Sequence, residues 1–196
     1  MTDIRICFVG DSFVNGTGDE KLLGWTGRVC RNARKSRYSI TAYNLGVRRD
    51  TSADIAARWQ EECRHRLPPD CDGRVVFSFG ANDTMVENGQ TRLTSDASER
   101  HAESILRAAA KRYKTLFIGP AAVADGDHNE RTVGLDNVLR EVSSRCGVPY
   151  LSVIAPLRKS YAWMKEVLSG DGAHPGSGGY TEMADLVLRW PEWWFR

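Results

Sequence analysis

The sequence predicts an α/β protein in which a five-stranded parallel sheet lies between two layers of helices. Short apolar runs rich in β-branched and aromatic residues alternate along the chain with longer segments that carry apolar residues at helical spacing. Such alternation favours parallel strands joined by right-handed helical crossovers. Residues 75–79 are almost continuously apolar, which is typical of a central strand covered on both faces. Five strands of this kind favour a three-layer α/β/α sandwich with the flavodoxin-like order 2-1-3-4-5.

Apolar periodicity and turn residues predict where the elements begin and end. The five strands are expected at residues 4–9, 39–45, 75–79, 115–118 and 149–153. The helices are expected at residues 25–35, about 51–66, 95–113, 129–146, 156–168 and 177–188. The glycine-rich residues 13–24 and the polar residues 87–95 are expected to form loops. Thr51 or Ser52 supplies the N-cap of the second helix, and two prolines end that helix.

Length and composition favour one globular domain over residues 1–196. The chain is long enough for one sizeable core, and no repeat, low-complexity tract or linker divides it. A net charge of +2, spread along the chain, gives no reason to expect a nucleic-acid partner. No apolar run reaches the roughly 20 residues of a membrane span, and no signal peptide is visible. We therefore expect a cytoplasmic protein.

The five cysteines predict reduced thiols, and they suggest neither a disulfide framework nor a metal site. Their number is odd, their spacings are long, and no C-x-x-C pair is present. Only oxidation would favour a bridge between Cys63 and Cys71. His65 lies near Cys63, but no paired ligand spacing follows, so we expect no metal and no cofactor.

Polar turns follow four of the predicted strands. Gly10-Asp11-Ser12 follows the first strand, Asn44-Leu45-Gly46 ends the second, and Gly80-Ala81-Asn82-Asp83 follows the third. A fourth polar stretch, residues 171–175, lies beyond the fifth strand. Because the carboxyl ends of parallel strands meet at one edge of a sheet, these residues are expected to lie close together.

The residue types at this edge are those of nucleophilic catalysis. Ser12, His174 and Asp171 supply a nucleophile, a base and a carboxylate that orients the base. The backbone N–H of Gly46 and the side-chain amide of Asn82, with the N–H of Ser12, could form an oxyanion hole. For each block the alternative is a structural turn, and this alternative has most weight for Asp171.

At these residues the chain resembles the SGNH-hydrolase family, also called the GDSL-type lipases, esterases and acylhydrolases. The family's four blocks are centred on Ser, Gly, Asn and His, and they appear here in order as Ser12, Gly46, Asn82 and His174. The resemblance implies a five-stranded parallel sandwich that hydrolyses esters or thioesters without a metal. It also implies Ser12 as nucleophile, His174 as base, Asp171 as its partner, and Ser12, Gly46 and Asn82 as oxyanion donors.

Two positions depart from the family pattern. Phe13 stands where the family name has Leu, and Arg49 stands where many members carry a second glycine, which bears on the shape and charge of the substrate entrance. Arg48 and Arg49 could meet an acidic group of a substrate or form a solvated turn. The candidates for substrate binding near the site edge are Trp25, Val47, Arg48, Arg49, Met85, Val86, Pro120 and Val123.

The expected function is that of a serine esterase that cleaves carboxylic esters of a small or lipid-like acyl substrate through an acyl-enzyme on Ser12. The alternatives on the same triad are a carbohydrate O-deacetylase and a thioesterase. An alternative from another class is a non-catalytic flavodoxin-like binding module, but neither G-x-x-x-x-G-K nor G-x-G-x-x-G is present. The expected partner is a small ester. The aromatic tail, residues 190–195, is expected to pack on the chain's own surface or to join a homodimer.

Overall fold

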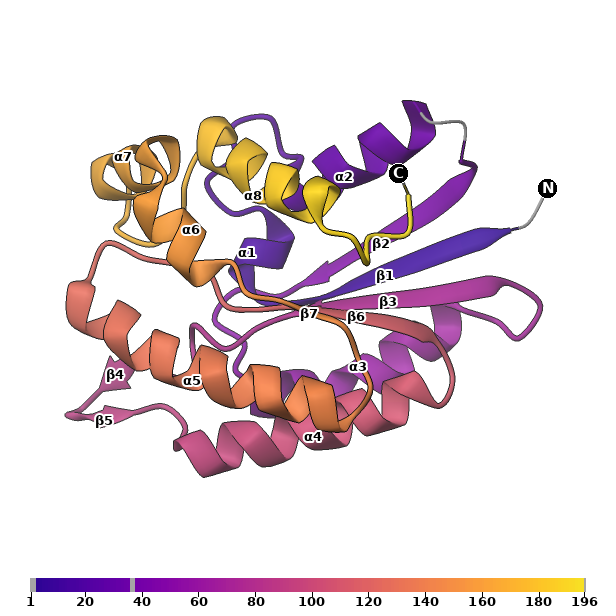
Figure 1. Cartoon of the computed structure of the whole chain (residues 1–196), viewed down its shortest axis with the longest axis horizontal. Coiled ribbons are helices and arrows are strands. Elements are labelled where there is room, and N and C mark those ends of the chain that lie inside the picture. The colour runs from indigo at the N-terminus through magenta and orange to yellow at the C-terminus, as the bar shows by residue number, and fades with distance from the viewer. Residues whose placement is uncertain (1–2, 36–37, 196) are drawn as a thin grey trace.

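A five-stranded parallel sheet forms the centre of the molecule (Figure 1). The computed structural model describes residues 3–35 and 38–195. In spatial order the strands are β2 (Ile40–Gly46), β1 (Ile4–Gly10), β3 (Asp72–Ser78), β6 (Lys114–Ile118) and β7 (Tyr150–Leu151). The strands β4 and β5 form a separate hairpin, so the sheet has the order 2-1-3-4-5 when only its own strands are counted. The predicted fold class is confirmed.

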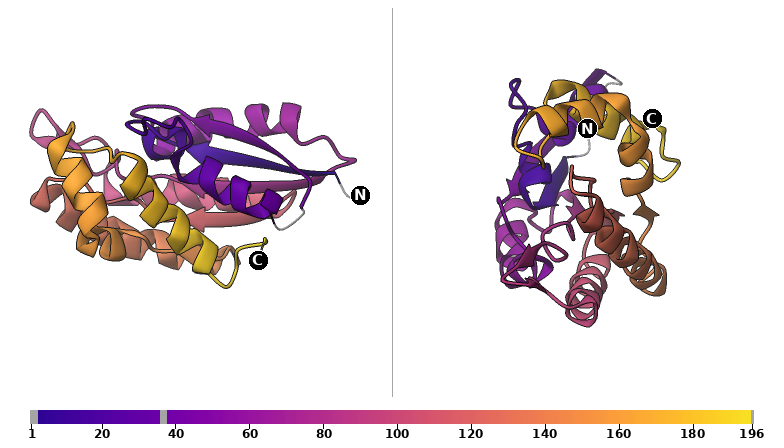
Figure 2. Two further views of the ribbon diagram at one scale, coloured as in Figure 1. Left: turned by 90° about the horizontal axis from the view of Figure 1, so that it is seen from above. Right: turned by 90° about the vertical axis from the view of Figure 1, so that its left-hand side faces the viewer.

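Helices cover both faces of the sheet, as the views in Figures 1 and 2 show. One layer contains α1 (Ser12–Asn15), α2 (Gly24–Lys35), α6 (Ile154–Lys159), α7 (Tyr161–Ser169) and α8 (Ser177–Arg189). The other layer contains α3 (Ser52–Arg66), α4 (Ser95–Ala110) and α5 (Gly126–Arg145). None of these helices, within the described residues, is long and apolar enough to cross a membrane.

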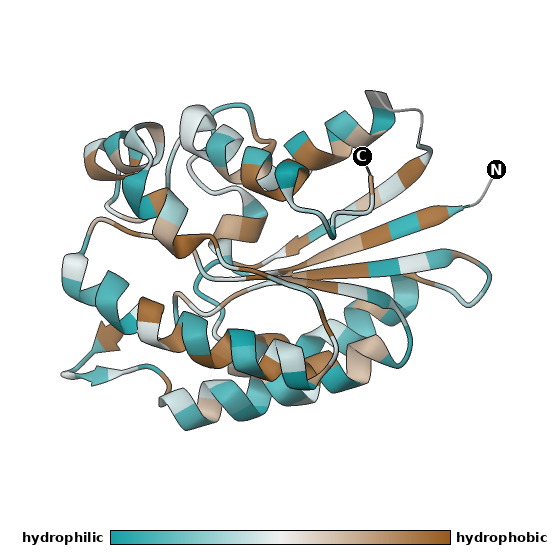
Figure 3. Ribbon diagram, viewed as in Figure 1, coloured by the Kyte–Doolittle hydropathy of each residue, from teal (hydrophilic) through white to brown (hydrophobic). Residues whose placement is uncertain are grey.

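The central strand β1 pairs with β2 and with β3 along its whole length, so it has no free edge. Because side chains alternate along a strand, Ile6 and Phe8 enter the core on one face, whereas Cys7 and Val9 enter the core on the other. Figure 3 shows that the helices turn apolar residues toward the sheet. Both faces of β1 therefore need apolar side chains, which explains its nearly continuous apolar sequence.

The structure differs from the prediction in three segments. The predicted loop over residues 13–24 begins as the helical turn α1, which Asp11 caps by accepting a hydrogen bond from the N–H of Phe13.

The predicted loop over residues 87–95 contains the hairpin of β4 (Val86–Glu87) and β5 (Gln90–Thr91). Its turn residues, Asn88 and Gly89, both have positive φ, which is the ordinary Asn-Gly hairpin geometry.

The third difference is a break in the helix predicted over residues 156–168. The chain forms α6 and α7, and Ser160 separates them because its hydroxyl accepts a hydrogen bond from the N–H of Trp163. This N-cap starts a new helix in a new direction. By contrast, the predicted N-cap at Thr51 is present, where Thr51 and Asp54 form a capping box at the start of α3.

The aromatic tail packs on the chain's own core. The side chains of Trp193 and Phe195 are buried, and Tyr38 meets Phe195 edge-on. The guanidinium of Arg74 lies 5.2 Å from the ring centre of Trp194 and 4.9 Å from that of Phe195, which is within the range of cation–π attraction. The tail therefore covers one end of the apolar layer between α2 and the sheet, and the homodimer stays a prediction.

Candidate active site

Ser12, His174 and Asp171 form a hydrogen-bonded chain at the carboxyl edge of the sheet. The Nε2 atom of His174 lies 2.8 Å from Ser12 Oγ, and its Nδ1 atom lies 2.7 Å from Asp171 Oδ2. Since the carboxylate can only accept, Nδ1 carries the proton and Nε2 is free to accept one from the serine hydroxyl. This is the geometry that lets a histidine act as a general base toward a serine.

Asp171 is held as a carboxylate. Its Oδ1 atom accepts hydrogen bonds from the backbone N–H groups of Ala173 (2.9 Å) and His174 (2.8 Å). Partial burial raises the pKa of Asp171, but the hydrogen bonds from the backbone and imidazole of His174 outweigh this effect and bring the pKa to about 2. Asp171 is therefore ionised at neutral pH.

Close backbone packing and an aromatic ring position the side chains of Ser12 and His174. Gly10 ends β1 so close to β3 that a Cβ atom there would lie 2.0 Å from the carbonyl oxygen of Ser78. The chain can therefore turn directly into α1, which places Ser12 at the first helical position. Phe13 packs its ring against the His174 imidazole, with 5.2 Å between ring centres. The residue that departs from the family name thus supports the imidazole of His174.

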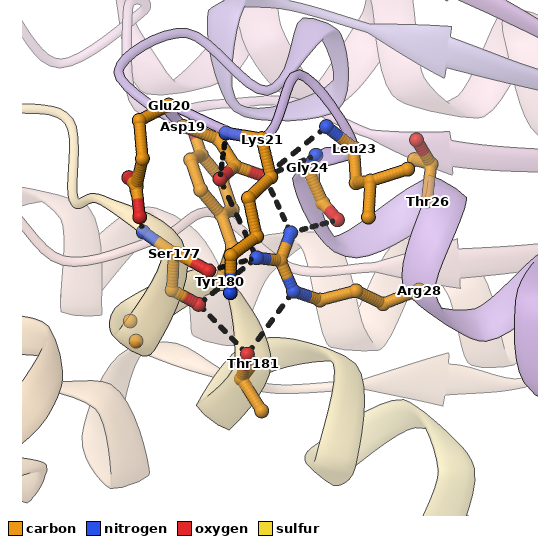
Figure 4. A network of polar contacts seen from close by, with 12 residues as sticks. Asp19, Glu20, Lys21, Leu23, Gly24, Thr26, Arg28, Ser177, Tyr180 and Thr181 are labelled. Carbon is orange, nitrogen blue, oxygen red and sulfur yellow. Dashed lines mark hydrogen bonds and ion pairs between the residues drawn. The ribbon is translucent and has the colours of Figure 1, made fainter.

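The loop between α1 and α2 lies against the backbone that carries His174. Gly18 has φ +90°, and a Cβ atom there would lie 2.7 Å from the carbonyl oxygen of Pro175. Behind this loop, the buried carboxylate of Asp19 accepts from the N–H groups at the start of α2 and pairs with Arg28 (Figure 4). Arg28 also donates to the hydroxyl and the carbonyl of Ser177, at the start of α8. This network joins the segment after Ser12 to the segment after His174.

Two further carboxylates hold the first turn of α8. Glu20 accepts from the N–H of Ser177, and Glu166 accepts from the N–H groups of Gly178 (3.1 Å) and Gly179 (2.6 Å). Carboxylates at a helix N-terminus satisfy its free N–H groups and complement its dipole. Sequence analysis missed Asp19, Arg28 and Glu166, because isolated charged residues carry no pattern that links them to a distant histidine.

Asn82 lies at the site and is oriented by the loop after β2. Its Nδ2 atom donates to the carbonyl oxygen of Asp50 (2.9 Å) and lies 3.4 Å from Asp11 Oδ2. Arg58 holds this loop, since its guanidinium pairs with the Asp50 carboxylate and donates to the carbonyl oxygens of Gly10 and Leu45. One amide hydrogen of Asn82 is thus fixed, and the other makes only a long contact that an oxyanion could replace.

The structure does not place Gly46 at the oxyanion position, and the prediction is corrected here. The N–H of Gly46 donates to Asn44 Oδ1 at 3.0 Å, and Gly46 is not among the described residues that line the cavity above Ser12. A Cβ atom at this position would lie 2.1 Å from the backbone nitrogen of Asn15. Glycine is needed here because the end of β2 packs directly on α1.

Arg49, three residues further along the chain, is a candidate for the donor role that Gly46 does not fill. Among the described residues its N–H has no hydrogen-bond acceptor, and the residue lines the same cavity as Ser12 and Asn82. Its φ of 70° is a left-handed conformation that favours glycine. The departure seen in the sequence, arginine where many family members carry glycine, was the available signal. Arg49 keeps the backbone conformation, while its side chain pairs with Glu87 of the hairpin.

A cavity of about 390 Å³ opens above Ser12. Of the predicted substrate-binding residues, it is lined by Arg48, Arg49, Met85, Val86 and Val123. Besides Phe13 of α1, sequence analysis missed six lining residues, which are Ala81, Asp125, His128, Arg131, Gly172 and Ala173. These residues come from loops and from the first turns of α5, whose approach to the site depends on the tertiary fold.

Three predicted substrate-binding residues lie elsewhere, and these predictions were wrong. Trp25 is fully buried in the core, where its ring meets Phe8 edge-on at 5.5 Å. Pro120 is buried at the end of β6, and Val47 is 42% exposed. None of the three is among the described residues that line the cavity. These residues were predicted because they lie near strand ends in the sequence, but this position alone does not fix the direction of a side chain.

The part of the chain that the structure describes contains no group of three or more His, Cys, Asp or Glu side chains arranged to hold a metal ion. All five cysteines are free thiols, and burial raises the pKa of Cys30 to about 12. Raised pKa values make Cys7, Cys30, Cys71 and Cys146 poorly suited to act as nucleophiles. That the protein works without a metal or cofactor stays a prediction.

A flavodoxin-like sheet with serine, histidine and aspartate assembled at its carboxyl edge is the arrangement of the SGNH class of hydrolases. Residues 8–181 match the GDSL-like Lipase/Acylhydrolase family, and the chain belongs to this family.

Similar proteins of known structure share the whole fold. The lipase/acylhydrolase from Enterococcus faecalis is 24% identical with a TM-score of 0.77, and the match covers 95% of this chain and 94% of that one. The acetylxylan esterase from Geobacillus stearothermophilus is 17% identical with a TM-score of 0.74, over 96% and 94% of the two chains. The uncharacterized protein YpmR of Bacillus subtilis (strain 168) is 23% identical over 166 residues, which are 84% of this chain and 56% of YpmR. The chain thus spans little more than half the length of YpmR.

The close approach of Gly46 to α1 predicts a sharp response to a single methyl group. Gly46→Ala would force apart two backbone segments and displace Ser12, so we expect a loss of about 2–3 kcal/mol in the free energy of unfolding. The control is Gly134→Ala in α5, where no atom lies within 4 Å of the added Cβ. We expect this control to gain about 0.5–1 kcal/mol, because alanine is the better helix former. Urea unfolding measures the free energy of unfolding of each variant. Equal values for the two variants would contradict the close approach of Gly46 to α1.

The buried carboxyl of Asp11 predicts a dependence of stability on pH. Burial raises its pKa to about 7, against the hydrogen bond from the N–H of Phe13, whereas an unfolded aspartate has a pKa of about 4. The folded state therefore holds a proton that the unfolded state releases, and the stabilisation present below pH about 4 is lost as the pH rises through 7.

Asp11→Asn removes this titration and keeps the oxygen that caps α1. We expect the variant to gain stability over wild type as the pH rises from about 4 to 8, by at most about 4 kcal/mol. Urea unfolding at a series of pH values measures the difference. Curves that stay parallel over this range would show that the pKa of Asp11 in the folded state is not raised above its unfolded value.

Proposed function

We propose that this protein is a serine esterase that hydrolyses carboxylic esters through an acyl-enzyme on Ser12. The observation that carries the proposal is the hydrogen-bonded chain of Ser12, His174 and Asp171 at the mouth of a cavity. Membership of a family of lipases and acylhydrolases supports it. Structures of three catalytic mutants of the similar acetylxylan esterase are also known. In each of them one residue, a serine, an aspartate or a histidine, is replaced by alanine.

In the acylation step, Ser12 Oγ attacks the ester carbonyl carbon while His174 Nε2 takes the hydroxyl proton. The carboxylate of Asp171 stabilises the imidazolium that forms and keeps the ring in the productive orientation. Collapse of the tetrahedral intermediate breaks the bond to the alcohol oxygen, and His174 gives its proton to that oxygen. The alcohol leaves, and the acyl group remains on Ser12.

Deacylation reverses these roles with water. His174 takes a proton from a water molecule, whose oxygen attacks the acyl carbon. The second tetrahedral intermediate releases Ser12 Oγ, which recovers the proton from His174. The products are a carboxylic acid and the free enzyme.

Three donors are proposed for the oxyanion of both intermediates: the N–H groups of Ser12 and Arg49 and the Nδ2–H of Asn82. Among the described residues the two backbone N–H groups have no other acceptor, and the amide is oriented by the carbonyl of Asp50. Donors fixed before the reaction stabilise developing charge without reorganising, and each is worth about 10²–10³ in kcat.

The lining of the cavity favours a short acyl group and a polar alcohol over a long lipid chain. Its wall carries three arginines, a histidine and an aspartate outside the triad, beside the apolar side chains of Met85, Val86 and Val123. A carbohydrate O-deacetylase is therefore the second candidate, supported by the similarity to an acetylxylan esterase. The cytoplasmic location stays a prediction, which imaging of the tagged protein in its own cells would test.

Ser12→Ala tests the proposal directly. Wild type is expected to hydrolyse 4-nitrophenyl acetate and acetylated sugars, and the variant is expected to lose at least about 10⁴-fold in kcat, because the triad acts as one unit. Ser144→Ala, an exposed serine at the end of α5, is the control that should keep wild-type kinetics. Circular dichroism confirms that each variant is folded. Undiminished turnover by folded Ser12→Ala would overturn the assignment of the nucleophile.

The oxyanion donors predict a contrast between Asn82→Ala and Arg49→Gly. Asn82→Ala removes a donor, so kcat and kcat/KM should both fall about 10²–10³-fold while KM changes little. Arg49→Gly keeps the backbone N–H and suits the positive φ, so kcat should stay within about threefold of wild type for a neutral acetate ester. Steady-state kinetics on one ester measures both. If folded Asn82→Ala kept the full kcat, Asn82 would have a purely structural role and would not be an oxyanion donor.

A further inference from the structure

Two arginine side chains in the wall of the cavity above Ser12 have no ion-pair partner in the described part of the chain. Arg48, Arg49 and Arg131 all line this cavity. The guanidinium of Arg49 pairs with Glu87, and so this charge is already balanced. Within residues 3–35 and 38–195, neither Arg48 nor Arg131 forms an ion pair with an acidic side chain. Two arginine side chains are thus left to meet a ligand in the cavity.

Arg131 is the better ordered of these two. It lies in the second turn of α5, half-buried, and its Nε atom donates to the carbonyl oxygen of Thr84 at 3.0 Å. Thr84 is itself fixed, because its hydroxyl bonds to Thr132 Oγ1 (2.7 Å) and to the carbonyl of Ala81 (3.1 Å). The Nη1 and Nη2 atoms of Arg131 have no acceptor among the described residues. A guanidinium held by Nε presents two parallel N–H groups, the geometry that binds an oxyanion in a bidentate manner.

The cavity lining also carries two carboxylates, those of Asp125 and Asp171. Asp171 is bonded to the Nδ1–H of His174 and to two backbone N–H groups. A hydrogen bond from the N–H of His128 and the nearby charges of His128 and Arg131 lower the pKa of Asp125, so it is ionised. The ring of His128 donates through Nε2 to the carbonyl of Ala81. Among the described residues, neither Asp125 nor Asp171 accepts a hydrogen bond from Arg48 or Arg131, so both guanidinium groups can bind an anionic group of a ligand.

We infer that the preferred substrate is an anionic ester whose carboxylate or similar oxyanion is bound by Arg131 and Arg48. This inference rests on the proposed esterase function and names the class of substrate that the same cavity takes. The anionic group belongs either to the acyl part or to the alcohol part of the ester. The chemistry of recognition is the same in both cases, and paired substrates distinguish them.

The test uses two pairs of esters in which a carboxylate is matched by a carboxamide. In the first pair, 4-acetoxybenzoate and 4-acetoxybenzamide, the charge is on the alcohol side. In the second pair, 4-nitrophenyl hemiglutarate and 4-nitrophenyl glutaramate, it is on the acyl side. We expect kcat/KM to favour the acid by about tenfold or more in one pair, as a charge-assisted bidentate bond implies, and that pair identifies the side.

The preference for the acid should depend on the two arginines and on no other positive charge. Arg131→Gln and Arg48→Gln should each reduce the preference about 5- to 10-fold, a magnitude typical of a lost charge-assisted hydrogen bond at a partly exposed site. Arg34→Gln removes an exposed charge from α2, away from the cavity lining, and should leave the preference unchanged. Equal kcat/KM for acid and amide in both pairs, or an unchanged preference in both cavity variants, would overturn the inference.

A binding measurement separates failure of this inference from failure of the esterase proposal. Calorimetric titration of Ser12→Ala with the two acids needs no turnover, and binding should weaken about 5- to 10-fold when Arg131→Gln is added. Hydrolysis of all four esters without a preference for the acid contradicts the anion site alone. Acid binding that depends on Arg131, with no hydrolysis that depends on Ser12, contradicts the esterase proposal and supports the anion site.

Discussion

The hydrogen bond between Ser12 Oγ and His174 Nε2 joins residues that are 162 positions apart, and the architecture on both sides keeps its two ends in place. On the serine side, Gly10 and Gly46 allow the ends of β1 and β2 to pack closely on β3 and α1. On the histidine side, Asp171 holds the ring, and Glu166 holds the helix that follows. The Asp19–Arg28 network ties the two sides together (Figure 4). The hydrogen bond of 2.8 Å is kept only if no element between these anchors shifts by more than a fraction of an ångström.

The carboxylates near the site show how local surroundings set different roles for one residue type. Asp171 accepts three hydrogen bonds and is half-exposed, so its pKa lies at about 2 and it stays charged beside the imidazole. Asp11 is buried and accepts a backbone N–H, and burial together with the nearby Asp83 and Asp50 raises its pKa to about 7. The contrast follows from the number of donors that face each group and from its access to water. It assigns the electrostatic role to Asp171 and the role of helix cap to Asp11.

Much of the fold could be predicted from the sequence, because the apolar strands and amphipathic helices follow simple periodicities and the polar turns follow the strands. The same reasoning found the residues that the structure brings together as Ser12, His174, Asp171 and Asn82, since each lies in a local motif at a strand end. It could not find Arg131, whose place in the cavity depends on how α5 packs. It also took Gly46 for a donor, because a glycine required for close packing and a glycine required for an exposed N–H look alike in a sequence. The left-handed backbone of Arg49 became visible only in three dimensions.

The central claim is that Ser12 attacks the substrate and that the N–H groups of Ser12 and Arg49, with the amide of Asn82, receive the developing negative charge. A crystal structure of the protein after reaction with a fluorophosphonate tests this most directly, because the phosphorus adduct resembles the tetrahedral intermediate. The account predicts a covalent bond from Ser12 Oγ to phosphorus. It also predicts that the phosphoryl oxygen lies about 2.7–3.1 Å from each of the three donor nitrogens. A phosphoryl oxygen bound to the N–H of Gly46, or an adduct on a residue other than Ser12, would contradict it.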